Sequence, residues 1–106
     1  MLPGADLPLF IRHCLARWPL LPPVLVERLA RTYGTRIAQL VGGARKLADL
    51  GRDYGAGLTT AEIRYLVENE WARSAEDILL RRTRLGLQFP ASALHDLQDA
   101  VAELAG

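Results

Sequence analysis

Proline and glycine divide this 106-residue chain into short segments, and within the segments apolar residues recur at helical spacing. The last segment is the clearest, with intervals of three, four and three between Leu94, Leu97, Val101 and Leu104. No segment alternates convincingly between apolar and polar residues, and no Asn-Gly or Asp-Gly pair suggests a hairpin. The pattern predicts an all-α fold, a single compact bundle of about six short helices without a sheet.

The first half of the chain carries start and stop signals for three helices. Asp6 is placed to cap the first, and Trp18 ends it because the following proline disfavours helical geometry in the preceding residue. Prolines open the second helix, where a missing N–H costs little, and Gly34 suits its end. Thr35 then caps a third, shorter helix, and residues 44–57 form a loop with at most one helical turn.

Residues 58–87 carry the strongest helix signals. Thr59 and Glu62 form a capping box, and Leu58 and Ile63 occupy the staple positions around it. A second helix in this stretch begins at a serine followed by two carboxylates and ends in three arginines before a glycine. That order suits the helix dipole, which favours acids at the start and bases at the end.

Composition limits the classes of function. The 13 basic and 12 acidic residues leave a formal charge of +1, so no general attraction to nucleic acid or anionic membrane is expected. No apolar run reaches the roughly 18 residues of a spanning helix, and no signal peptide is indicated. The length suits one domain, residues 1–106, in a reducing compartment such as the cytoplasm, because the single cysteine has no partner.

The residue types that build enzyme sites are sparse. His13 and His95 lie far apart in sequence and show no zinc spacing. Cys14 reads as a buried, inert thiol. The Gly55 and Gly57 pair lacks both the third glycine and the preceding strand of a dinucleotide-binding turn. We therefore expect no catalytic, cofactor-binding or metal-binding residue in this chain.

A basic cluster is the best candidate for recognition. Arg81, Arg82 and Arg84 crowd the end of the helix that begins near Ser74. They are candidates for an anion or interdomain contact. The alternative is that they stabilise the helix C-terminus and pair with nearby carboxylates, because the dipole alone favours cations there.

Two residues before that helix are expected to be structural. Trp71 is predicted to anchor the core at the helix junction. Glu70 continues the apolar stripe of the preceding helix, so a buried position would require a cation, and Arg81 or Arg82 is the expected partner. The hypothesis predicts that Glu70→Ala destabilises the domain much more than Glu68→Ala, and equal melting temperatures would remove it.

Two long stretches together resemble one family. They read DYGAGLTTAEIRYLVENEWARSAEDILLRRTRLGL and LPPVLVERLARTYGTRIAQLV, and they resemble the C-terminal helical domain of the FAD-dependent glycerol-3-phosphate dehydrogenases. The opening LPGA resembles the junction after the flavin domain. Leu80 replaces a tryptophan that is common at that place in the family, and Arg84 replaces a frequent lysine.

The resemblance implies a parent enzyme that oxidises sn-glycerol 3-phosphate to dihydroxyacetone phosphate. Its FAD would pass electrons to quinone, or to oxygen in oxidase relatives, and the enzyme would lie peripherally on the cytoplasmic side of the inner membrane. The flavin and substrate residues belong to the larger N-terminal part. This chain would be an inactive helical domain that supports the flavin domain or a contact between two copies.

Two other functions remain open from the residues. A helical protein–protein interaction module would need an exposed apolar face. A helix-turn-helix DNA binder would need a basic recognition helix. The balanced charge and the acidic start of the Ser74 helix speak against DNA binding, so no nucleic-acid partner is expected.

Overall fold

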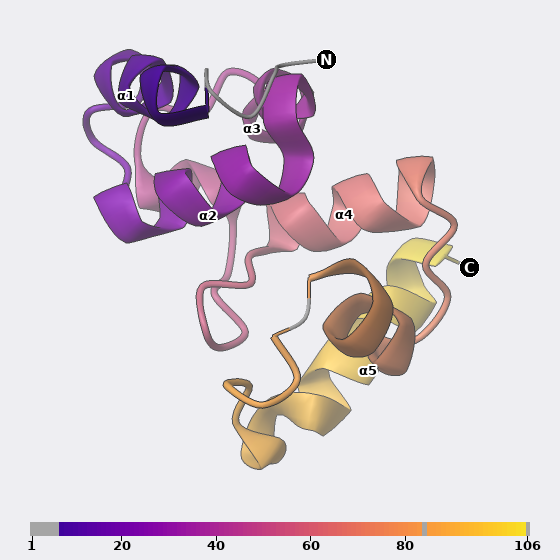
Figure 1. Ribbon diagram of the computed structural model, residues 1–106. Helices are drawn as coiled ribbons and strands as arrows, with labels where there is room; N and C mark the ends of the chain where they lie inside the picture. Colours follow the sequence, from indigo (N-terminus) through magenta and orange to yellow (C-terminus); the bar gives the residue numbers. More distant parts are fainter. Residues whose placement is uncertain (1–6, 84, 106) are drawn as a thin grey trace. The chain divides into compact units, whose positions relative to one another are not determined.

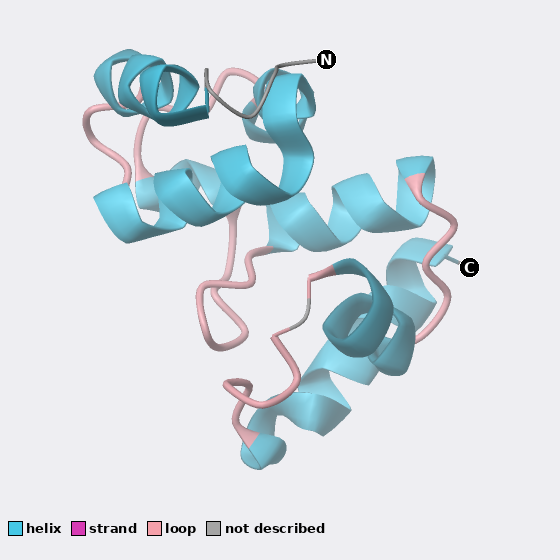
Figure 2. Cartoon of the chain, viewed as in Figure 1, coloured by secondary structure: helices cyan, strands magenta, loops and turns pink. Residues whose placement is uncertain are grey.

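The computed structural model describes residues 7–83 and 85–105, without the side chains of residues 81 and 82. Within these residues the structure contains five α-helices and several short 3₁₀ or π segments (Figure 1). No β-strand occurs in the described residues, and only an isolated bridge joins Asp53 to Thr59 (Figure 2). The all-α class is therefore confirmed. The chain divides into two compact units, residues 1–50 and 51–106.

The first unit contains α1 (Leu7–Arg17), α2 (Pro23–Tyr33) and α3 (Ile37–Val41), and α1 packs against α2. The helix α1 ends where proline predicts it, with the Trp18 N–H donating to the Cys14 carbonyl at 3.0 Å. The core of this unit is apolar and little exposed to solvent, and its buried side chains belong to Ile11, Cys14, Trp18, Leu21, Leu25, Val26, Leu29, Ala30, Ile37, Leu40, Val41 and Leu50.

One cap in the first unit differs from the prediction. Gly34 ends α2 with a φ of +57°, which confirms its expected role as a stop. The chain then continues directly into a 3₁₀ turn, η2 (Gly34–Arg36), so Thr35 lies inside that turn and does not cap α3. The expected short helical turn in the following loop is η3 (Leu47–Leu50).

The second unit contains α4 (Thr60–Asn69), the π-helix η4 (Asp77–Arg82), the 3₁₀ turn η5 (Ala91–Ala93) and α5 (Leu94–Ala105). The helix α4 packs against α5. The buried face of α5 includes Leu97 and Val101, as the spacing predicts. At the loop before α4, Arg52 donates to the Asp96 carboxylate of α5 at 2.7 Å, and this hydrogen bond raises the pKa of Arg52.

The start of α4 confirms the staple and corrects the capping box. Leu58 and Ile63 are both fully buried. Thr59 occupies the cap position, but its side chain makes no capping hydrogen bond. The neighbouring threonine ties the helix start to the loop instead, because the Arg52 N–H donates to Thr60 Oγ1 at 3.0 Å and the Thr60 N–H donates to the Arg52 carbonyl at 3.0 Å.

The helix expected from Ser74 to Gly86 differs in type and length. It opens with one α-helical step at residues 75–76, continues as η4 and ends at Arg82. Thr83 closes it, since its N–H and its hydroxyl both donate to the Ile78 carbonyl at 2.9 Å. This i to i−5 closure is the wider turn of a π-helix. No helix in the described part of the chain is both long and apolar enough to span a membrane.

Candidate functional site

The basic cluster lies at the end of η4. Arg81 and Arg82 are the last two residues of this π-helix. Their side chains, and the whole of Arg84, lie outside the described residues. The anion or interdomain contact of these arginines therefore stays a prediction, as does their pairing with Glu70.

Trp71 does not anchor the core, which corrects the prediction. Its side chain is 77% exposed, and its backbone has a φ of +63°. The Ala72 N–H returns to the Leu66 carbonyl at 3.1 Å, so Trp71 occupies the left-handed position at which α4 ends. That turn directs the indole ring outward, where the Arg73 guanidinium lies 5.6 Å from its centre.

Glu62, and not Glu70, is the fully buried carboxylate of α4. Glu70 is half-buried at the end of the helix, where its N–H donates to the Leu66 carbonyl at 2.9 Å. Every buried side-chain nitrogen or oxygen in the described residues has a hydrogen-bond partner, so the Glu62 carboxylate is satisfied. Glu62 lies four residues before Leu66, and this spacing places it on the apolar face of the helix. The interpretation of Glu62 as part of a capping box did not use that spacing.

The described residues show no cluster of side chains that could hold a metal ion. No group of three or more histidine, cysteine, aspartate or glutamate side chains gathers in this part of the chain. His13 and His95 are both exposed, and His95 lies 3.3 Å from Asp99 on the same helix. Cys14 is buried, and desolvation raises the pKa of its thiol despite the nearby Arg17. A thiol of this kind is a poor nucleophile.

Three amides at the N-terminus of the Ser74 helix donate to side chains of the protein. Ser74 Oγ accepts from the Asp77 N–H at 3.1 Å, which confirms the predicted start. The Asp77 carboxylate accepts from the Arg73 N–H at 3.0 Å. The Gln98 side chain of α5 accepts from the Ala75 N–H at 2.9 Å. These amides therefore hold the helix in place and are not available to an anionic ligand.

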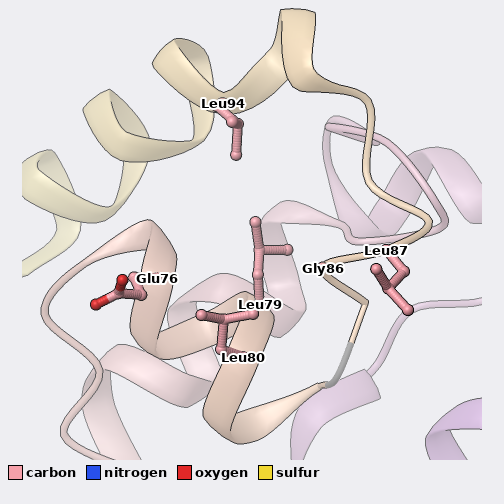
Figure 3. Close-up of a pocket in the computed structure, with 6 residues that line it drawn as sticks. All are labelled: Glu76, Leu79, Leu80, Gly86, Leu87 and Leu94. Carbon is pink, nitrogen blue, oxygen red and sulfur yellow. The ribbon is translucent and has the colours of Figure 1, made fainter.

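An apolar groove is the most distinctive surface of the second unit (Figure 3). It is a hollow of about 500 Å³ between η4, the loop after it and the start of α5, lined by Glu76, Leu79, Leu80, Gly86, Leu87 and Leu94. In Figure 3 the Leu94 side chain points from α5 toward η4. Leu79 is buried, whereas the other leucines are exposed to different degrees.

Gly86 shapes the groove and does not end the helix. Its φ is not positive, and a Cβ at this position would lie 2.9 Å from Leu80 Cδ2. The Gly86 N–H donates to the Leu79 carbonyl at 3.2 Å, which holds the loop against η4. The sequence pointed to this glycine as a stop signal, whereas the folded loop places it against the flexible end of the Leu80 side chain.

A family model described as the C-terminal domain of alpha-glycerophosphate oxidase matches residues 1–106. Among curated proteins, the glycerol-3-phosphate dehydrogenase of Pseudomonas aeruginosa is 51% identical over 71 residues, which cover 67% of this chain and 14% of that protein. The aerobic glycerol-3-phosphate dehydrogenase of Escherichia coli is 45% identical over 75 residues, or 71% of this chain and 15% of that protein.

A third relative, the D-erythritol 1-phosphate dehydrogenase of Brucella abortus, is 44% identical over 81 residues, which cover 76% of this chain and 16% of that protein. The aligned part thus spans only 14–16% of the length of these curated relatives. The family model, in contrast, extends over the whole chain. The chain therefore belongs to the family of the C-terminal domain of alpha-glycerophosphate oxidase.

Proposed function

We propose that residues 1–106 act as the non-catalytic C-terminal helical domain of an FAD-dependent glycerol-3-phosphate dehydrogenase. The observation that carries the proposal is the 45–51% identity to glycerol-3-phosphate dehydrogenases within the family match. The parent enzyme oxidises the secondary alcohol of sn-glycerol 3-phosphate to the ketone of dihydroxyacetone phosphate. Two electrons and two protons leave the substrate, and quinone or oxygen finally accepts the electrons.

The flavin belongs to the preceding part of the parent chain in this proposal. A dinucleotide site requires a strand, a glycine-rich turn and a helix in succession. The described residues contain no strand, and the loop with Gly55 and Gly57 follows a 3₁₀ turn. This chain therefore does not offer the fold that holds FAD, and its proposed task is to support the domain that does.

The proposed location follows the family resemblance. We place the parent enzyme on the cytoplasmic side of the inner membrane, associated with it peripherally. The arginine cluster at positions 81, 82 and 84 is proposed to contact the preceding domain or an anion bound there. Replacing these arginines with glutamine in the parent enzyme should raise the apparent KM for substrate, and unchanged kinetics in a folded protein would contradict this contact.

The test of the function compares the intact parent enzyme with a form that ends before this domain. The intact enzyme should oxidise glycerol 3-phosphate, and the shortened form should lose that activity. The flavin content of the shortened form distinguishes between two roles of this domain. Lost activity with flavin retained assigns this domain to support of the site, and lost flavin assigns it to stability. A folded, flavin-loaded intact enzyme without activity toward glycerol 3-phosphate would refute the proposed substrate.

A second substrate is favoured by one specific observation, the 44% identity to a D-erythritol 1-phosphate dehydrogenase. Both candidate substrates are polyol monophosphates, so the same parent architecture serves either. We expect glycerol 3-phosphate to give the higher kcat/KM, and a higher value for D-erythritol 1-phosphate would reverse the assignment.

A further inference from the structure

We propose that the apolar groove between η4 and α5 is a docking surface for an apolar segment of the preceding, flavin-holding part of the same polypeptide. This inference rests on the proposed function and specifies the partner of one surface. Three of the four leucines listed for the groove are exposed to solvent, namely Leu80, Leu87 and Leu94.

These leucines are exposed well beyond what packing within this chain requires. Leu87 is 104% exposed, Leu80 is 61% exposed and Leu94 is 43% exposed. Burying a leucine side chain removes apolar surface from water and stabilises the state in which it is buried. The fold gains almost none of this stabilisation from Leu87, because that side chain stays exposed. Three open leucines around one hollow therefore form an apolar patch of the kind that marks an interaction site.

The groove is held open by the backbone and does not depend on a ligand. The wide π-turn is closed by the Thr83 N–H, which donates to the Ile78 carbonyl at 2.9 Å. The loop on the other side is fixed by the hydrogen bond from Gly86 to the Leu79 carbonyl, and Leu79 itself forms a buried floor. A preformed apolar site binds at a low entropic cost, because little has to become ordered.

The size of the groove favours a tethered occupant. Six of the described residues line it, whereas a stable interface between separate proteins uses about 20–30 residues on each side. A segment on the same polypeptide has an effective concentration in the millimolar range, so a small contact suffices. The aligned relatives are about six to seven times longer than the matched segment, since it covers 14–16% of their length.

The negative charge of Glu76 at the edge of the groove limits which side chains the docked segment can carry there. Glu76 is exposed at the edge of the groove, and its carboxylate is drawn apart from the leucines in Figure 3. A like charge beside it would be repelled. The occupant is therefore an apolar segment without an acidic side chain opposite Glu76.

The test measures whether position 87 is covered in the full-length parent protein. The variant Leu87→Cys is reacted with iodoacetamide, and modification at position 87 is quantified by mass spectrometry against the same variant unfolded in guanidinium. Leu20→Cys is the matched control, because Leu20 is also a largely exposed leucine but lies in the first unit. The native Cys14 is buried and reacts slowly in the folded protein.

We expect Cys at position 87 to react at least about tenfold more slowly in the folded parent than in the unfolded chain, as for other protected sites. A smaller ratio overturns the proposal. The ratio is measured again after a hundredfold dilution, and loss of protection there would assign the cover to a second copy and also overturn it. Failure of the proposed substrate leaves this readout unchanged, because alkylation does not depend on turnover.

Discussion

At the scale of single residues, Trp71 combines a left-handed backbone with a largely exposed indole ring. A left-handed conformation costs a residue other than glycine about 1–2 kcal/mol. Trp71→Gly removes that cost, but it also removes the contact with Arg73, worth about 0.5–1 kcal/mol, and makes the unfolded chain more flexible. We therefore expect the free energy of unfolding to change by less than about 1 kcal/mol.

The second tryptophan is the control for this prediction. Trp18 is buried in the first unit, so Trp18→Ala should cost about 3–5 kcal/mol. Chemical denaturation of both variants gives the comparison. A loss above about 3 kcal/mol for Trp71→Gly would restore the core-anchor role that the sequence suggested.

The buried Glu62 carries the second prediction at this scale. Removing the Glu62 carboxylate leaves its hydrogen-bond partner unsatisfied, which costs about 1–3 kcal/mol. We expect Glu62→Ala to lower the melting temperature most, Glu70→Ala to lower it less, and Glu68→Ala to leave it nearly unchanged, because the three side chains are buried, half-buried and exposed. A melting temperature for Glu62→Ala equal to that of Glu68→Ala would contradict the assignment.

At the scale of elements, the loop before α4 depends on a glycine. Gly51 has a φ of +86°, and a Cβ there would lie 2.6 Å from Thr60 Cβ, which belongs to the first turn of α4. Gly51→Ala therefore strains the backbone and also brings the new Cβ too close to Thr60 Cβ. Rotation of the threonine side chain does not move its Cβ, so the clash remains. We expect a loss of about 2–3 kcal/mol in thermal or chemical unfolding.

Gly43 is the matched control in the first unit. Its φ is not positive, and a Cβ there would meet no atom within 4 Å. Gly43→Ala should be neutral or stabilising by about 0.4–1 kcal/mol, since alanine reduces the freedom of the unfolded chain. Equal losses of unfolding free energy for Gly51→Ala and Gly43→Ala would show that the close approach of Thr60 does not require a glycine at position 51.

At the scale of the whole molecule, titration at both ends of the pH range limits stability. The Arg45 and Lys46 N–H groups donate to the Asp49 carboxylate at 3.1 and 3.3 Å and hold its pKa below the ordinary value of 3.8. Because the pKa of Asp49 is lower in the folded state, its carboxylate contributes to stability above the pKa that it has in the unfolded chain. This contribution is lost as pH falls through the pKa of the folded state. Asp49→Asn should make the acid loss between about pH 5 and pH 2 shallower.

The loss of stability at alkaline pH comes from a group whose pKa is raised, not lowered, in the folded state. Burial raises the pKa of Cys14 above the ordinary value of 9.0, so its contribution is complete below that value and is lost as pH rises through the folded pKa. We expect the contribution of Cys14 to stability to decline above pH 9.0. Melting temperatures of the wild type, Asp49→Asn and Cys14→Ala across the range check both signs, and curves of the same shape for all three would refute the assignment.

Local signals in the sequence determined most of the helices, because their causes are local. Proline fixes backbone geometry, glycine permits a positive φ, and short polar side chains compete for the first amides of a helix. These rules located the C-terminal end of α1, both ends of α2, the staple positions around Leu58 and the cap at Ser74. The family likewise follows from residue order alone, since the match extends over residues 1–106.

Tertiary structure decided the burial of several individual side chains and what the loops build. The π-turn of η4, the outward Trp71 and the buried Glu62 depend on how α4, η4 and α5 pack within the second unit, and no single segment encodes that packing. The groove likewise arises where Gly86 brings its loop against η4 and opposite Leu94, residues of three separate segments. Local propensity sets the ends of a helix, whereas burial is set by contacts between segments distant in sequence.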